Sequence, residues 1–125
     1  MAVTNASTYS NFGDLSPVFV TSTSVNSGST ESAAVDLGSL RMVGIVTPAI
    51  TGTTCSFEVN HVVAGSTASY KPVYDKAGVL TTAALGTNEY TVLTAVDWLG
   101  VNDFKVVMGT AQATTTALTI VCVKY

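Results

Sequence analysis

His61 is the only histidine in the 125-residue sequence, so any Ser-His-Asp or Cys-His catalysis would have to use it. It continues the alternation of Cys55, Phe57 and Val59, and this period of two predicts a partly buried, hydrogen-bonded imidazole near the end of a strand. A general base also needs a substrate or nucleophile within hydrogen-bonding distance, which sequence spacing does not supply. We therefore expect a protein that is not an enzyme.

Carboxylates are the next candidates for chemistry, because a pair of them can flank a sugar or help to hold a cation. Asp97 and Asp103 form such a pair on either side of a predicted turn. However, the sequence has no calcium-loop pattern, no spaced His and Cys ligands and no Gly-rich phosphate loop. Aspartates beside Trp98 and Gly100 are commonly turn formers. The sequence therefore predicts neither a metal nor another cofactor.

Aromatic side chains could bind a ligand by stacking. Tyr70, Tyr74, Tyr90 and Trp98 could form a flat platform for a sugar ring, as in carbohydrate-binding β-sandwich modules. Alternatively, Trp98 caps one end of the core and the tyrosines line its rim. We prefer the capping role for Trp98, because it follows a predicted strand and opens a bend.

The composition indicates a protein that assembles. Charged residues make up 10% of the chain, against about 25% in an ordinary soluble domain, and the mean hydropathy is +0.44. Such a surface should display more apolar area than an isolated monomer usually carries. The net charge of −3 argues against nucleic-acid binding, as does the scatter of the basic residues, Arg41, Lys71, Lys76, Lys105 and Lys124.

Cellular location can be predicted from the same sequence. Residues 1–5 lack the basic start and apolar run of a secretory signal, and no segment reaches the length of a membrane span. We therefore expect synthesis in a cytoplasm and no membrane partner. Cys55 and Cys122 should stay reduced there, as buried thiols in apolar strands rather than a disulfide.

The candidate histidine, carboxylate and aromatic side chains must be positioned by strands. Eight short segments have strand patterns, and no segment of useful length has a helical period. The segments are 18–25, 31–37, 40–46, 54–63, 70–74, 87–93, 104–108 and 116–123. They predict an all-β, single-domain antiparallel β-sandwich with jelly-roll-like connections, with a barrel as the alternative.

Within this fold, we expect 40–46 and 54–63 to form a central hairpin around the turn at 47–53. The first strand should be covered on both faces, with Gly44 admitting a close neighbour. Residues 95–100 should form a bend.

An extended N-terminal arm, residues 1–16, should precede the sandwich domain, residues 17–125. The arm is rich in Asn, Ser and Thr, and its only large apolar groups are Tyr9, Phe12 and Leu15. It either packs on its own core or frays in solvent, or it docks these anchors on a neighbouring subunit.

Scattered core and turn residues between about 30 and 124 resemble small virion structural proteins of tailed bacteriophages. In the first half these are Val35-Asp36-Leu37-Gly38, Leu40, Val43-Gly44, Pro48-Ala49, Phe57-Glu58-Val59, Tyr74-Asp75 and Gly78. In the second half they are Asp97-Trp98-Leu99-Gly100, Phe104-Lys105-Val106, Gly109-Thr110, Gln112 and Leu118 to Val123. The sequence departs from the family pattern at 60–65, where relatives tend to have a polar turn.

The resemblance implies a capsid decoration, or cement, protein. Such a protein would bind the major capsid protein on the exterior of the virion after synthesis in the host cytoplasm, as a homo-oligomer for which a trimer is favoured. The candidate partner-binding residues are Tyr9, Phe12 and Leu15 in the arm and Asn60, His61 and Val62 in the divergent loop. A phage tail or fibre component and a carbohydrate-binding module, with Tyr70, Tyr74 and Trp98 as stacking residues, are the alternatives.

Overall fold

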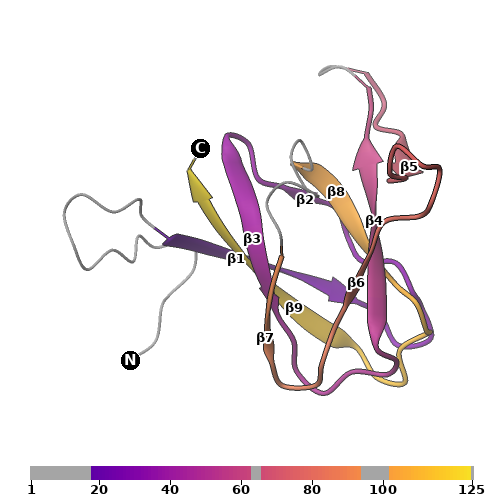
Figure 1. Ribbon diagram of the computed structural model, residues 1–125. Helices are drawn as coiled ribbons and strands as arrows, with labels where there is room; N and C mark the ends of the chain where they lie inside the picture. Colours follow the sequence, from indigo (N-terminus) through magenta and orange to yellow (C-terminus); the bar gives the residue numbers. More distant parts are fainter. Residues whose placement is uncertain (1–17, 63–65, 94–101, 125) are drawn as a thin grey trace.

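The computed structural model describes residues 18–62, 66–93 and 102–124, and these ranges contain nine strands and no helix (Figure 1). The strands are β1 (Val18–Val25), β2 (Val35–Asp36), β3 (Leu40–Val46), β4 (Thr54–Asn60), β5 (Tyr70–Pro72), β6 (Thr82–Ala84), β7 (Tyr90–Val92), β8 (Asp103–Met108) and β9 (Thr116–Lys124). All pairings among these strands are antiparallel. The predicted all-β class is confirmed.

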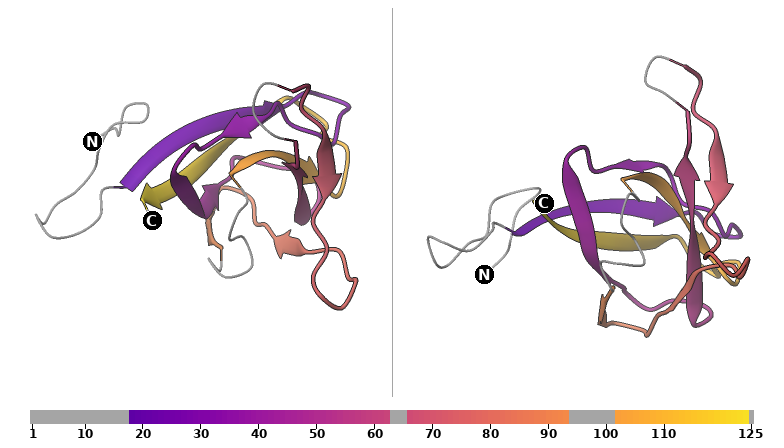
Figure 2. Two further views of the ribbon diagram at one scale, coloured as in Figure 1. Left: turned by 90° about the horizontal axis from the view of Figure 1, so that it is seen from above. Right: turned by 45° about the horizontal axis from the view of Figure 1, so that its top comes forward.

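The strands form two sheets with jelly-roll connections. One sheet has the order β1-β9-β3-β7, and the other has the order β2-β8-β4-β5, with β6 also paired to β4. The first strand thus pairs with the last, the second with the last but one, and the third with the last but two. This is one long antiparallel ribbon folded over on itself, which is how a jelly roll is built. Figure 2 shows β1 and β9 side by side in both views.

The predicted central hairpin is wrong. β3 pairs with β9 and β7, whereas β4 pairs with β8, β5 and β6, so the two strands belong to different sheets. The Pro48 and Gly52 segment between them therefore carries the chain across the sandwich. Turn residues of this kind suit a crossing connection as well as a hairpin, and sequence alone does not distinguish the two.

Several predicted strands are shorter than expected. The 31–37 segment contains only β2 and isolated bridges at Glu31 and Ser32, 87–93 is reduced to β7, and β4 ends at Asn60. One strand, β6, was not predicted. Its Thr-Ala-Ala sequence has neither the alternation nor the large β-branched and aromatic residues of a typical strand.

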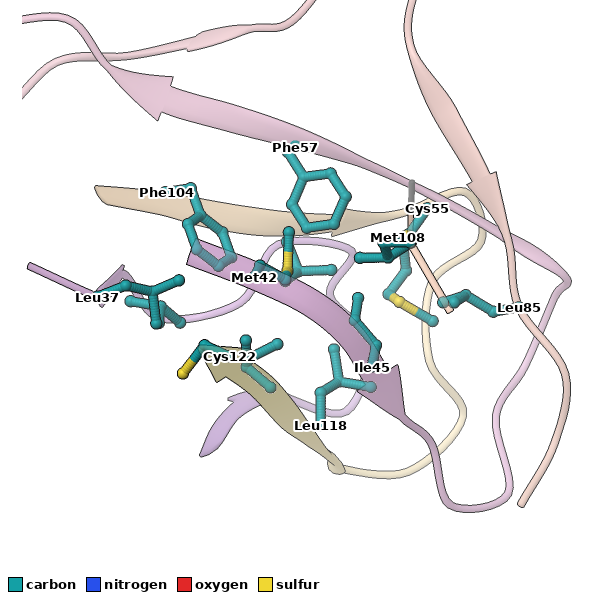
Figure 3. Packing of buried hydrophobic residues seen from close by; sticks show 14 of the residues in the cluster. Leu37, Met42, Ile45, Cys55, Phe57, Leu85, Phe104, Met108, Leu118 and Cys122 are labelled. Atoms are coloured by element: carbon teal, nitrogen blue, oxygen red, sulfur yellow. The ribbon is translucent and has the colours of Figure 1, made fainter. Parts of the chain in front are cut away.

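The core lies between the two sheets, whose inward side chains interdigitate (Figure 3). Cys55 and Phe57 are buried and Val59 packs against the core, as the period of two predicted. The rings of Phe57 and Phe104 meet edge to face with centroids 5.4 Å apart. Cys55 and Cys122 are both buried and free, as predicted, and burial raises the pKa of the Cys55 thiol to about 12.

Gly44 admits a large neighbour, as predicted. A Cβ atom at this position would lie 2.5 Å from the Tyr90 ring, so the ring of β7 packs directly on the β3 backbone. The register of β3 with β9 shifts between Met42 and Gly44. Glycine is required here because the Tyr90 ring leaves no room for a Cβ atom. The backbone conformation is not the reason, since the φ of Gly44 is not positive.

Gln112 ties the loops together at one end of the sandwich. Its amide Oε1 accepts from Thr51 N at 3.0 Å and from Thr116 Oγ1 at 3.1 Å. Its Nε2 donates to the carbonyls of Thr51 at 2.8 Å and Thr110 at 2.9 Å. Gln112 is 1% exposed, so both the oxygen and the nitrogen of this buried amide have hydrogen-bond partners inside the protein.

Candidate functional site

The outer face of the five-stranded sheet carries a cluster of charged and hydrogen-bonded side chains. Asp103 and Lys105 alternate along β8 with the buried Phe104 and Val106, so their side chains lie on the solvent side. Neighbouring strands add further charged side chains to this face, namely Glu31, Asp36 and Glu58. With four carboxylates and one ammonium, this face has the same formal charge, −3, as the whole chain.

Asp103 is the centre of one cluster on this face. Its Oδ1 accepts from the Tyr70 hydroxyl at 2.8 Å, and its Oδ2 accepts from Asn60 Nδ2 at 2.9 Å. Asp36 is its direct cross-strand neighbour. The hydrogen bond to Asp103 is the main reason that the pKa of Tyr70 is raised, with smaller effects of burial and of the charges of Asp103 and Asp36.

Lys105 is the centre of the adjoining cluster. Its Nζ lies 3.1 Å from Glu31 Oε1 and 4.8 Å from the centroid of the Tyr70 ring, and Glu58 is its cross-strand neighbour. A hydrogen bond between the Glu31 and Glu58 carboxyl groups is the largest cause of a lowered pKa at Glu31 and a raised pKa at Glu58. Of the two carboxyl groups, Glu58 is therefore the one that takes up a proton at the higher pH.

Replacing Glu58 with glutamine should stabilise the protein slightly near neutral pH. The folded protein raises the pKa of Glu58, so ionisation of this group costs stability as the pH rises through that value. Glutamine removes the cost and keeps a donor toward Glu31. Because the face is solvated, we expect a gain of at most about 0.5 kcal/mol, measured by urea unfolding.

The difference between wild type and Glu58→Gln should vanish below the ordinary glutamate pKa of 4.5, where Glu58 is protonated. Glu31→Gln should have the opposite sign near neutral pH, because it removes the Lys105 ion pair. Equal effects of the two substitutions near neutral pH would contradict the opposite pKa shifts of Glu31 and Glu58.

Asn60, His61 and Val62 lie where β4 leaves the sheet, and their roles differ. Asn60 Oδ1 accepts from the backbone N–H groups of Val62 and Ser69, both at 3.1 Å, so Asn60 holds the base of this loop closed. Val62 is half-buried. His61 is exposed, with Nε2 3.2 Å from Ser69 Oγ. The predicted partial burial of His61 is wrong because the strand ends at Asn60, and the alternation ends with it.

Tyr74 lies in a hairpin that follows β5 and extends from the same sheet. Tyr74 forms a bridge with Leu80, and the backbone bonds Asp75 N to Val79 O and Thr81 N to Val73 O join the two arms. A groove of about 620 Å³ opens along this hairpin. It is lined by Val73, Tyr74, Asp75, Lys76, Leu80, Thr81 and Thr82.

The predicted sugar platform is therefore not a single surface. Tyr70 is half-buried and bonded to Asp103, Tyr74 is 58% exposed in the groove, and Tyr90 belongs to the other sheet. Trp98 and Asp97 lie outside the described residues, as do three candidate partner-binding residues, Tyr9, Phe12 and Leu15. The predictions for these five side chains stay predictions.

Known proteins give no further guide to this site. No family model matches the sequence, and comparisons with curated proteins and with solved structures found no match. Function must be inferred from the side chains themselves.

Two arrangements that could support chemistry are absent from the described residues. His61 has no carboxylate partner within them, and they include no group of three or more His, Cys, Asp or Glu side chains that could hold a metal. They also contain no helix of the length and apolar character needed to cross a bilayer.

The cluster around Asp103 and Lys105 was not predicted as a unit. The alternation of Asp103 and Lys105 with Phe104 and Val106 is visible in the sequence and would have placed both charges on one face. The partners Glu31, Glu58 and Tyr70 come from other strands, however, and only the sheet register brings them within reach.

Proposed function

We propose that this protein is a non-enzymatic capsid decoration protein that binds the outer surface of the major capsid protein and stabilises the virus shell. The sequence resemblance to small phage virion proteins supports this function. The structural observation that supports it best is that both edge strands of the four-stranded sheet lack charged residues. Edges of this kind favour association with another chain.

The first of these edges is β1. Ala33 N donates to Ser24 O at 3.2 Å, so the Ser24 carbonyl points away from β9. Backbone groups alternate along an antiparallel strand, and those of Val18, Val20 and Ser22 therefore point to the same open side. No other described segment pairs with β1 along 18–22. This edge has no Lys, Pro or bulge to discourage pairing.

The second edge is β7, which pairs only with β3 among the described strands. Its two outer side chains are large and apolar, with Tyr90 52% and Val92 77% exposed. An exposed apolar edge of this kind is uncommon on a monomer and favours an interface.

Two different edges on one sheet fit a ring of subunits. If β1 of one copy lies against β7 of the next, the contact is head-to-tail, and a head-to-tail contact that closes gives a cyclic oligomer. In this proposal Tyr9, Phe12 and Leu15 anchor the subunit on the capsid, and His61 and Val62 add a second contact.

The proposal predicts a trimer in solution that co-sediments with capsids lacking this protein. Val20→Lys and Val92→Lys place a charge on either edge and should convert the trimer to monomer, as measured by light scattering. Ser29→Lys adds the same charge at an exposed turn and should leave the mass unchanged.

A wild-type monomer that does not co-sediment with capsids would overturn the proposed function. Binding to purified tails in place of capsids would instead identify a tail or fibre component. Deletion of residues 1–16 tests the anchors separately, and unchanged capsid binding by this variant would exclude them.

A further inference from the structure

We infer that the groove along the Val73–Thr82 hairpin binds the ring of a neutral sugar, with Tyr74 as the stacking residue. The groove is on the five-stranded sheet, whereas the proposed trimer contacts are on the edges of the four-stranded sheet. The inference therefore stands independently of the capsid proposal.

The aromatic wall of the groove is Tyr74. Its side chain is 58% exposed although it is large and partly apolar. An exposed aromatic ring offers a flat apolar surface with a negative face, which suits the C–H face of a pyranose ring. Leu80, 37% exposed, extends the apolar surface on the opposite arm.

The polar lining indicates a ligand with many hydroxyl groups and no net charge. Asp75 and Lys76 contribute one charge of each sign, and Thr81 and Thr82 contribute two hydroxyls. A phosphate or sulfate group would need an excess of basic residues. A wholly apolar ligand would leave these polar groups without hydrogen bonds. A neutral sugar has hydroxyl groups that can donate to and accept from side chains of these types.

Asp75 is held in position before any ligand binds. Its Oδ1 accepts from Ala77 N at 2.8 Å and from Val79 N at 3.0 Å. Both bonds use Oδ1, which leaves Oδ2 to accept from a sugar hydroxyl. Gly78, with φ of 80°, completes the turn in a conformation that other residues rarely adopt. A fixed turn reduces the entropy that binding would cost.

The groove volume of about 620 Å³ lies within the range of small-molecule sites, roughly 300 to 1,000 Å³. The other described tyrosines are less suited to stacking. Lys105 lies over the Tyr70 ring, and the Tyr90 ring packs on the backbone of Gly44. Tyr74 is thus the best single position at which to test sugar binding.

The test is saturation-transfer NMR with methyl glycosides of glucose, galactose, mannose and N-acetylglucosamine, followed by titration of any glycoside that binds. Tyr74→Ala should weaken binding at least about tenfold, which corresponds to about 1.4 kcal/mol. Tyr74→Phe keeps the ring and should bind within a few-fold of wild type. Tyr90→Ala removes a tyrosine of similar exposure and should bind as wild type does.

The inference is overturned if none of the four glycosides receives saturation from the wild-type protein. It is also overturned if binding survives Tyr74→Ala, or if Tyr90→Ala abolishes it. Thermal unfolding of each variant shows that a loss of binding is not a loss of fold. Capsid co-sedimentation of Tyr74→Ala should be unchanged, so failure of this inference can be distinguished from failure of the proposed function.

Discussion

Replacement of Gln112 by leucine is expected to destabilise the protein by about 2 to 4 kcal/mol, because it removes the partner of several enclosed polar groups. Leucine fills most of the space but offers no donor or acceptor. The N–H and carbonyl of Thr51 and the carbonyl of Thr110 lose a hydrogen bond, whereas the Thr116 hydroxyl can still donate to the Thr114 carbonyl at 3.0 Å. Urea unfolding, followed by tryptophan fluorescence or circular dichroism, measures the change.

Gln112→Glu tests the same network with a signed pH dependence. A carboxylate in place of the amide would face two carbonyl oxygens where Nε2 now donates. Burial and these oxygens should raise the pKa of the new carboxyl, so the variant should lose stability as the pH rises. Thr114→Val is the control, because this exposed neighbour should change stability by no more than about 0.5 kcal/mol. A Gln112→Leu variant as stable as Thr114→Val would contradict the role of the amide.

Phe57→Ala should have the largest effect, a loss of about 3 to 5 kcal/mol. Phe57 is 0% exposed and its ring meets Phe104 edge to face, so truncation leaves a cavity and removes an aromatic contact. A domain of ordinary stability has about 5 to 15 kcal/mol in total. The variant should therefore unfold at a much lower urea concentration or fail to fold.

Phe57→Leu keeps the measurement possible if the alanine variant does not fold. It retains more of the buried volume and should cost less than the alanine variant does. Val79→Ala, at a side chain 60% exposed, provides the surface control and should be nearly neutral. Similar effects at Phe57 and Val79 would show that Phe57 is not the core residue that its position indicates.

The fold could be predicted where local pattern determines structure. Alternation in Cys55, Phe57 and Val59 identified the inward face of β4, and the absence of helical periodicity identified the all-β class. The partner of each strand was harder to predict. Pairing depends on which strands lie side by side across long stretches of chain, and neither the supposed β3–β4 hairpin nor the short β6 carried a local signal that separated the alternatives.

The candidate site was predictable only in part, for the same reason. Tyr70 and Tyr74 were identified from their types and Asn60 from its place in the divergent loop, but their separation into a hydrogen-bonded cluster and an open groove follows from the register. His61 was misplaced because the sequence does not show where a strand ends. Gln112 was named only among the scattered positions of the family resemblance, because burial of its amide depends on the contact with Thr51, which is far from it in the sequence.

The pairing of β1 with β9 has a consequence for how the molecule is made. Val18 pairs with Val123, and β9 also provides the only connection between β1 and β3 within their sheet. During translation β3 can pair with β7, whereas β1 has no partner in its sheet among the described strands until Thr116–Lys124 leaves the ribosome. Contacts between such distant parts of a chain form slowly. The nascent chain therefore keeps the uncharged strand β1 without its sheet partner during most of its synthesis, which makes β1 a segment that benefits from protection before folding is complete.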